Sequence, residues 1–180
     1  RGMKMAKRVL IIDTSILCVW LQVPGMDTCG PDDNHWNYDR VKEKIDREMK
    51  SNALFVLPLA TIIETGNHIS QVSGDNYQLA EKLGELMKYS AEEKKPWAAF
   101  AAQADDLWSK GKLIELANNW PKLAAQKISI GDATIKDVAD YYHSLVDNYH
   151  VEIFTGDEGL KAYSPTPIKE ERVPRRRRGK

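Results

Sequence analysis

The sequence predicts an α/β fold built around a parallel β-sheet. Short apolar runs occur at residues 9–12 and 54–57, and a third, interrupted by Glu152, occurs at residues 151–154; each ends in turn-forming or polar residues, as buried parallel strands do. The segments between these runs carry apolar residues at helical spacing. Strands that alternate with helices favour an α/β fold with a parallel sheet. A chain of 180 residues suits one domain, or one domain with an insertion, and supports a single sizeable core.

The first predicted strand, at residues 9–12, leads directly into Asp13-Thr14-Ser15. Residues 24–35 are rich in Pro, Gly and Asp, so we expect a loop there. Residues 38–49 are predicted to form an amphipathic helix, because apolar side chains recur every four positions at Val41, Ile45 and Met49.

The second predicted strand, at residues 54–57, precedes a helical region. Pro58 can occupy the first turn of a helix, so we expect a helix over residues 59–69, which contains Glu64. A further helix is predicted over residues 77–87, with apolar positions at Leu79, Leu83 and Leu86.

An aromatic segment opens the second half of the chain. Residues 96–112 predict a helix whose apolar stripe consists of Trp97, Phe100, Ala101, Ala104 and Trp108. We expect this stripe to be buried in the core or in an insertion, with a partner-binding or base-stacking surface as the alternative. Trp120-Pro121 is expected in a polar linker.

A long helix and the third strand complete the predicted domain. The helix over residues 133–146 follows Gly131-Asp132, and its expected apolar face consists of Ile135, Val138, Ala139, Tyr142 and Val146. The strand at residues 151–155 ends at Gly156-Asp157. Residues 164–180, rich in Pro and Arg, are expected to form a solvated tail.

The charges of the chain are unevenly distributed. Lysine plus arginine and aspartate plus glutamate both number 26, so the formal net charge is zero. Residues 9–164, however, carry 15 basic and 24 acidic side chains, a net charge of −9, and both ends are basic. The strongest basic cluster consists of Arg175, Arg176, Arg177 and Arg178. We expect this cluster to bind phosphates; the alternatives are a solvated tail without a role and a tail that an acidic protein binds.

Composition also excludes some classes of protein. No apolar run is long enough to span a membrane, and the N-terminal residues do not follow the pattern of a signal peptide, so we expect a cytoplasmic protein. Cys18 and Cys29 are then expected to remain free thiols.

Four acidic residues are expected at the carboxyl edge of the sheet, where parallel sheets commonly have their binding sites. Asp13 follows the first strand and Asp157 follows the third, and the carboxyl ends of parallel strands meet at one edge. Glu64 and Asp132 lie on helices that follow a strand or a glycine turn, so both can lean toward that edge. Converging carboxylates repel one another unless a cation neutralises them, and such oxygen ligands select Mg²⁺ or Mn²⁺.

Each of these acids also has a simpler interpretation. Asp13 could be a turn or helix-cap residue, and Asp132 a helix N-cap. Glu158 is the alternative to Asp157 if the register differs by one. Asp137 is expected to be solvent exposed, although either it or Asp140 could approach a metal in a variant site.

Two polar residues lie one helical turn after Glu64. Asn67 and His68 are candidates for substrate binding, and ordinary surface positions are the alternative.

The ordered set of motifs resembles the PIN-domain family of metal-dependent nucleases. The family pattern is an Asp with a hydroxyl or amide residue two positions on, a helical Glu, an Asp that opens a later helix, and a Thr-x-Asp after a strand. The matching residues here are Asp13 and Ser15, Glu64, Asp132, and Thr155 with Asp157. The resemblance implies a three-layer α/β/α sandwich with a central, mainly parallel sheet over residues 8–163, and a Trp-containing helical insertion around residues 91–128. Residues 1–7 would be an N-terminal extension.

The same resemblance implies a chemistry. Asp13, Asp132 and Asp157 would hold Mg²⁺ or Mn²⁺, with Glu64 as a ligand or water-orienting base, while Ser15 and Thr155 orient the carboxylates. The expected activity is a metal-dependent endoribonuclease acting on single-stranded RNA, as a toxin or defence effector. Its expected partners are RNA, an antitoxin or other protein, and a second copy of the chain.

Two other functions are compatible with parts of this pattern. One is a catalytically silent PIN-fold module that serves in RNA binding or assembly, which the four intact acids disfavour. The other is a phosphatase, which needs a second Asp two positions after the first, where this chain has Ser15.

Overall fold

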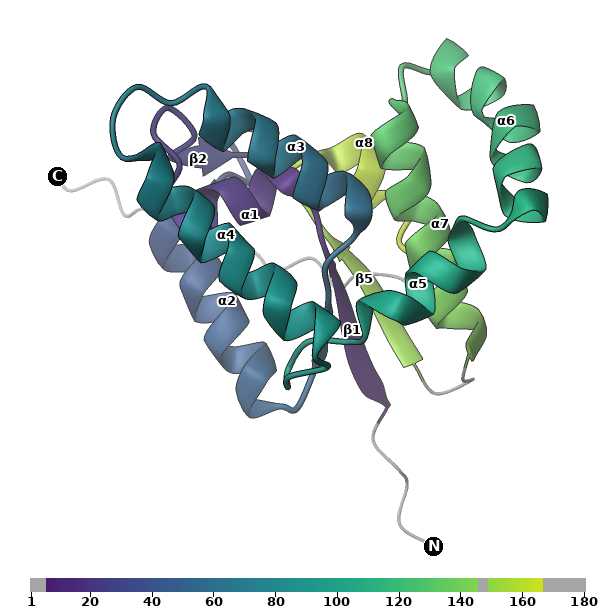
Figure 1. The fold of residues 1–180 in the computed structure, drawn as a ribbon, viewed down its shortest axis with the longest axis horizontal. Helices are drawn as coiled ribbons and strands as arrows, with labels where there is room; N and C mark the ends of the chain where they lie inside the picture. The colour runs from purple at the N-terminus through teal and green to yellow at the C-terminus, as the bar shows by residue number, and fades with distance from the viewer. Residues whose placement is uncertain (1–5, 146–148, 167–180) are drawn as a thin grey trace, which may run out of the picture.

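A computed structural model of the chain describes residues 6–145 and 149–166. Its centre is a sheet of three parallel strands in the order β4-β1-β5 (Figure 1). These strands are β1 (Lys7–Ile12), β4 (Leu54–Val56) and β5 (Tyr149–Phe154). The α/β fold with a parallel sheet is therefore confirmed, and its three strands coincide with the three apolar runs of the sequence.

Helices cover both faces of this sheet, an arrangement compatible with a three-layer α/β/α sandwich. β1 is the central strand, and Val9 pairs with Leu54 on one side and with Val151 on the other. Alternate residues of β1 enter two separate apolar clusters, because neighbouring side chains of a strand point to opposite faces.

Four helices cover the first face. They are α1 (Thr14–Leu21), α2 (Tyr38–Lys50), α3 (Leu59–Ser70) and α4 (Asn76–Ala91). α2 begins where the Asn37 side chain accepts a hydrogen bond from the Arg40 N–H, and it buries Val41 and Ile45. Met49, predicted on the same apolar face, is instead 45% exposed near the end of the helix.

α7 (Ile130–Leu145) covers the second face together with the short helix α8 (Glu158–Lys161). Four of the predicted apolar positions of α7 are buried there, namely Ile135, Val138, Ala139 and Tyr142; Val146 lies outside the described residues. The helix begins three residues before the predicted start, so Gly131 and Asp132 belong to its first turn.

The aromatic segment differs from its prediction. Instead of one helix over 96–112, the structure has α5 (Phe100–Leu107) and α6 (Lys110–Ala125), because the Ser109 hydroxyl accepts a hydrogen bond from the Lys112 N–H and starts a new helix. The Phe55 N–H donates to the Pro96 carbonyl at 2.8 Å, so the chain before α5 lies along the edge of β4.

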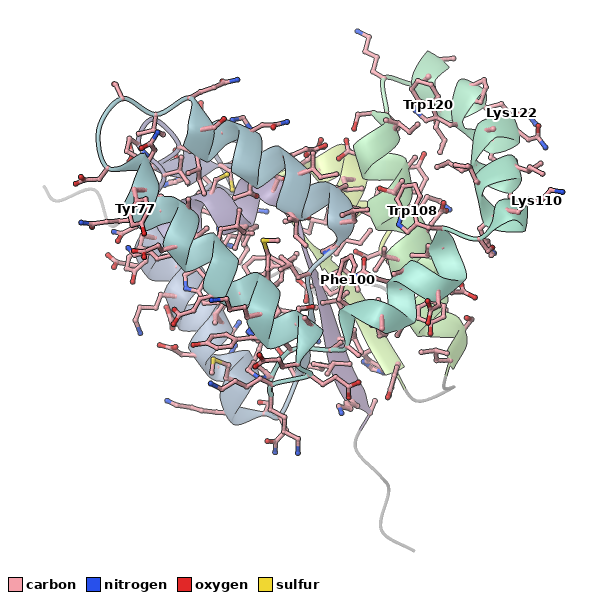
Figure 2. All side chains as sticks on the ribbon, viewed as in Figure 1. Tyr77, Phe100, Trp108, Lys110, Trp120 and Lys122 are labelled. Carbon is pink, nitrogen blue, oxygen red and sulfur yellow. The ribbon has the colours of Figure 1, made fainter. Side chains whose placement is uncertain are left out.

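The predicted aromatic stripe is consequently divided. Trp97 is 5% exposed and packs against Trp20 and Phe55 in the core, whereas Trp108 is 42% exposed at the end of α5. The polar linker predicted at Trp120-Pro121 is wrong, because both residues lie within α6. The Trp120 indole N–H donates to the Ile128 carbonyl at 3.2 Å and lies on the side of α6 that faces α7, while Lys110 points away from the body (Figure 2).

The predicted loop at residues 24–35 contains β2 (Thr28–Cys29), which forms a short hairpin with β3 (Trp36–Asn37) directly after the loop. Trp36 packs edge-on against Phe154, which holds this hairpin against the end of β5. Cys18 and Cys29 are both free thiols, as predicted. Within the described residues, no helix is both long and apolar enough to cross a membrane.

Beyond α8 the chain turns back along β5. The Ser164 and Thr166 hydroxyls accept hydrogen bonds from the Ile153 and Val151 N–H groups, each at 3.0 Å. These two residues of the predicted tail therefore lie against the sheet. The four arginines proposed to bind phosphates, Arg175, Arg176, Arg177 and Arg178, lie outside the described residues.

Candidate active site

Asp13 lies at the junction of β1 and α1, at the carboxyl edge of the sheet. Its side chain is 5% exposed, and its Oδ2 accepts hydrogen bonds from the Ser15 hydroxyl at 2.9 Å and the Thr155 hydroxyl at 2.6 Å. The backbone of Asp13 has an N-cap conformation, but among the described residues its carboxylate makes no capping bond to α1. Asp13 therefore occupies the N-cap position of α1, as the simpler interpretation holds, but its carboxylate is bound to Ser15 and Thr155 instead of capping the helix.

The two hydroxyl groups connect Asp13 to the chain that follows β5. The Ser15 Oγ accepts from the Gly156 N–H and the Thr155 Oγ1 accepts from the Asp157 N–H, both at 3.0 Å. Each hydroxyl thus donates its proton to the Asp13 carboxylate and receives one from the backbone. This arrangement has the geometry expected of residues that orient a carboxylate.

Glu64 reaches the same edge from α3. The hydroxyl of Thr14, a residue only 6% exposed, donates to the Glu64 Oε2 at 2.9 Å. The other oxygen, Oε1, lies over Gly131 in the first turn of α7. Glu64 therefore lies between the N-terminal turns of α1 and α7.

Asp132 lies in the first turn of α7. The Ser129 hydroxyl accepts a hydrogen bond from the Asp132 N–H at 3.0 Å, so Ser129 caps this helix. The interpretation of Asp132 as the N-cap is therefore wrong. Burial, followed by the charges of Asp13, Asp157 and Glu64, raises the pKa of Asp132 to about 6, against a smaller opposing effect from its hydrogen bond with Ser129. The structure thus brings the four predicted acids within electrostatic reach of one another.

Asp157 has a second role that the sequence did not predict. Its Oδ1 accepts hydrogen bonds from the Gly159 and Leu160 N–H groups, so the exposed side chain caps α8. The neighbouring Glu158 is directed elsewhere, because its Oε1 accepts from the Asn34 amide at 3.2 Å. Asp157 is therefore the acid that belongs to the cluster, and one of its oxygens is already occupied.

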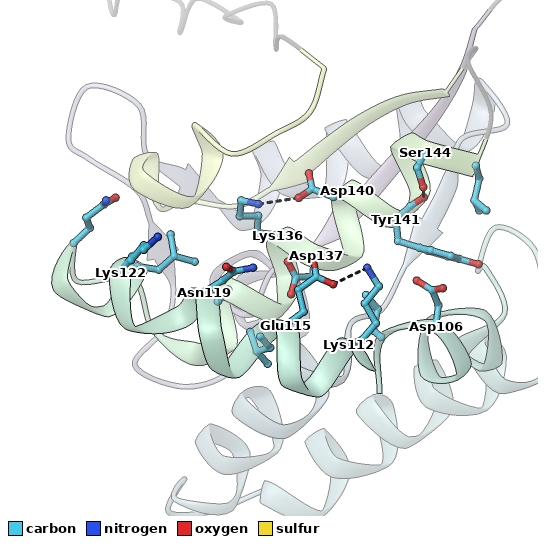
Figure 3. A pocket seen from close by; sticks show the side chains of 16 residues that line it. Asp106, Lys112, Glu115, Asn119, Lys122, Lys136, Asp137, Asp140, Tyr141 and Ser144 are labelled. Carbon is cyan, nitrogen blue, oxygen red and sulfur yellow. Dashed lines mark hydrogen bonds and ion pairs between the residues drawn. The ribbon is translucent and has the colours of Figure 1, made fainter. Parts of the chain in front are cut away.

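The acids considered for a variant site lie on a different side of α7. Asp137 and Asp140 line a groove of about 830 Å³ between α6 and α7, opposite residues such as Lys112 and Glu115 (Figure 3). Asp140 pairs with Lys136 at 2.8 Å. The expectation of a solvent-exposed Asp137 is wrong, because the residue is half-buried and burial raises its pKa.

Asn67 and His68 are both exposed on α3. His68 lines a cavity of about 410 Å³ with residues such as Pro24, Met26 and Val72. The described contacts do not join either residue to the acid cluster, and their role in substrate binding stays a prediction.

Two residues of the site were missed from the sequence. Thr14 is the donor that fixes Glu64, and its position directly after Asp13 was an available signal. Gly131 was interpreted as part of a turn, although it is helical and adjoins the Glu64 carboxylate. Neither contact has a local sequence pattern, because Thr14 and Gly131 lie 50 and 67 positions from Glu64.

The donor chemistry of this cluster suits a hard divalent cation. Asp13 and Asp132, with Glu64 and Asp157, supply carboxylate oxygens. The raised pKa of Asp132 reflects burial first and then repulsion by the neighbouring acids, and a cation would neutralise this repulsion. Among the described residues, however, no three Asp, Glu, His or Cys side chains stand in a preformed metal-binding arrangement. The residue types therefore fit Mg²⁺ or Mn²⁺, and their side chains would have to adjust to ligate it.

The electrostatics of Asp132 lead to a stability prediction. A carboxyl group whose pKa rises from 3.8 to about 6 on folding destabilises the native state as the pH rises between these values. The full shift corresponds to about 3 kcal/mol, which solvent screening of this partly exposed group reduces to roughly 1–2 kcal/mol. Without divalent ions, Asp132→Asn should raise the free energy of unfolding by that amount at pH 7.5 and by much less at pH 3.5.

Urea denaturation at the two pH values measures this difference. Asp140→Asn is the matched control on the same helix, because Asp140 is exposed and paired with Lys136. An equal stability change at both pH values for Asp132→Asn would contradict the raised pKa of Asp132.

The site thus combines a fixed carboxylate at Asp13, a hydroxyl-bound Glu64 and a destabilised Asp132 at one edge of the sheet. Such a cluster can bind a cation, orient a water molecule and approach a phosphodiester. No protein-family model, curated protein or solved structure matches the chain.

Proposed function

We propose that this protein is a PIN-like, divalent-metal-dependent endoribonuclease that hydrolyses phosphodiester bonds of single-stranded RNA. The observation that supports this proposal most directly is the convergence of Asp13, Glu64, Asp132 and Asp157. Asp157 also caps α8, but a purely structural role for the buried Asp13 together with the half-buried Glu64 and Asp132 would be difficult to explain, because gathering like charges costs stability. A regulatory partner such as an antitoxin belongs to the same proposal.

The residues of the cluster have distinct tasks in this proposal. Asp13 and Asp132, with Glu64 and Asp157, would hold Mg²⁺ or Mn²⁺, which when bound would lower the pKa of a water molecule and offset charge on the phosphodiester. Ser15 and Thr155 orient the Asp13 carboxylate by donating to its Oδ2. Glu64, anchored through Oε2 by Thr14, can direct Oε1 toward a water molecule.

Cleavage of an end-labelled single-stranded RNA tests the proposal. The protein should cut this RNA with Mn²⁺ or Mg²⁺ and lose the activity in EDTA. Asp132→Asn should lower the rate by about 100-fold or more, which corresponds to roughly 2.7 kcal/mol of transition-state stabilisation. Asp137→Asn is the matched control five positions along α7, in the groove facing α6, and should stay within about 2-fold of the unmodified protein.

A silent RNA-binding or assembly module is the second candidate. It is favoured by the absence, among the described side chains, of a preformed set of three metal donors, and by the capping role of Asp157. RNA binding without cleavage in either Mg²⁺ or Mn²⁺ would support this candidate and reject the nuclease.

A further inference from the structure

The glycine that precedes Asp132 has an unusual environment for a helical residue. Gly131 lies in the first turn of α7, with a backbone that any L-amino acid can adopt. Glycine is the poorest helix former after proline, so its presence there lowers helix stability without any benefit to the backbone conformation. The reason for a glycine at this position must therefore come from its surroundings.

Those surroundings contain the Glu64 carboxylate. A Cβ atom built on Gly131 would overlap the Glu64 Oε1 and lie 3.3 Å from the Glu64 Cδ, while the Ser129 hydroxyl oxygen is 3.7 Å away. Glu64 thus occupies the volume that any other side chain at position 131 would need.

Two other helical glycines show that this contact is specific. Gly84 in α4 and Gly111 in α6 have no described atom within 4 Å of the position of a Cβ. Alanine at either position would meet open space, whereas alanine at Gly131 would displace an acid of the candidate active site.

The opposite side of Glu64 is held by a hydrogen bond. Thr14, buried at the start of α1, donates its hydroxyl proton to the Glu64 Oε2 at 2.9 Å. The carboxylate is therefore held by a donor on α1, and it extends into the space that a side chain at position 131 of α7 would fill. A methyl group on Gly131 would be accommodated by rotation of the flexible Glu64 side chain, which leaves the fold intact and moves the carboxylate.

We propose that Gly131 and Thr14 are positioning residues for Glu64. Gly131 provides the space into which the carboxylate extends beside Asp132, and Thr14 selects the rotamer that fills this space. The effect of the two residues on activity rests on the proposed nuclease function, whereas their effect on the position of Glu64 does not.

Crystal structures of the unmodified protein and of Gly131→Ala test the steric part directly. The unmodified protein should show Glu64 over Gly131, and the variant should show the Glu64 carboxylate displaced with its hydrogen bond to Thr14 broken. Its melting temperature should stay within about 4 °C of the unmodified protein, since helix propensity gained offsets the lost hydrogen bond. An undisplaced Glu64 in the variant would overturn the proposal whether or not the protein cleaves RNA.

RNA cleavage tests the consequence for activity. Gly131→Ala should lower the rate by about 10- to 100-fold, as loss of groups that orient metal ligands commonly does, while the control Gly111→Ala should leave it unchanged. The shorter side chain of Glu64→Asp does not reach the space beside Gly131. In this background, Gly131→Ala should lower the cleavage rate by less than about 2-fold. Equal losses in the two backgrounds would overturn the positioning role.

Conservative changes at Thr14 separate the effect of its hydrogen bond to Glu64 from the effect of its side-chain volume. Thr14→Val removes the donor at nearly constant volume and should lower the cleavage rate by about 10-fold or more, whereas Thr14→Ser keeps the hydroxyl and should retain most of the activity. Equal rates for the two variants would reject the role of Thr14. If the unmodified protein cleaves no RNA, the nuclease proposal fails, and the crystal structures still decide how Glu64 is positioned.

Discussion

Replacement of Asp13 by Asn should lower RNA cleavage by about 1,000-fold or more, equivalent to roughly 4 kcal/mol of transition-state stabilisation. Asp13 is the most buried acid of the cluster, and its Oδ2 accepts two hydroxyl protons at 2.9 and 2.6 Å. Asparagine preserves the shape and one acceptor oxygen but removes the negative charge that a divalent cation requires. Single-turnover cleavage of an end-labelled RNA measures the loss.

Circular dichroism and thermal denaturation provide the control for folding of Asp13→Asn. The variant should keep the secondary structure of the unmodified protein, because its amide oxygen has two lone pairs and can accept both of the hydroxyl protons that Oδ2 accepts in Asp13. Asp140→Asn, an exposed acid on the far side of α7, should cleave at the normal rate. Retained activity in Asp13→Asn, with the fold intact, would show that the cluster does not carry out the proposed reaction.

Replacement of Glu152 by Ala should lower the free energy of unfolding by about 3–5 kcal/mol. The Glu152 carboxylate lies between two cations, with the Arg8 Nη2 at 2.7 Å and the Lys44 Nζ at 3.0 Å. Lys44 and Glu152 are only 4% and 8% exposed, so removal of the carboxylate leaves Lys44 buried without its ion-pair partner. Urea denaturation at neutral pH measures the effect.

Two further variants identify the cause of this destabilisation. Asp140→Ala breaks the more exposed ion pair with Lys136 and should lower the free energy of unfolding by less than about 1 kcal/mol. The double change of Lys44→Met and Glu152→Leu replaces the buried pair by apolar side chains and should recover most of the stability lost in Glu152→Ala. A double variant as unstable as the single one would argue against an unpaired buried charge as the cause.

The buried ion network also explains part of the charge distribution. Arg8, counted among the basic residues at the N-terminal end, pairs with Glu48 at 2.7 Å as well as with Glu152. One basic residue of the N-terminal end is thus paired with two acids of the net-negative body, and Lys44 supplies the second positive charge. Composition cannot reveal this pairing, because the residues lie 40 and 144 positions apart.

The helical predictions succeeded where one apolar face is buried against the sheet. α7 shows this clearly, because Ile135, Val138 and Tyr142 repeat at the spacing that one helix face requires. The same pattern failed over residues 96–112, where Trp97 joins the core from an extended segment and Ser109 starts a new helix. Helical spacing is ambiguous there, because the apolar residues of the segment are buried by different parts of the molecule.

The sequence by itself determined the three strands and the placement of Asp13 and Asp157 after them. These features depend on runs of neighbouring residues, whose burial and turn propensity are local properties. Only the tertiary structure decided that Glu64 lies between Thr14 and Gly131, that Ser129 rather than Asp132 caps α7, and that Asp157 caps α8. The first of these contacts depends on how α1, α3 and α7 are oriented over the sheet edge, and the two caps depend on which side chain reaches each helix end. The Glu64 contacts span 50 and 67 positions and leave no pattern in the sequence. The two caps are local contacts only two or three positions long, but neighbouring polar residues are equally plausible caps, and only the structure shows which of them forms the hydrogen bond.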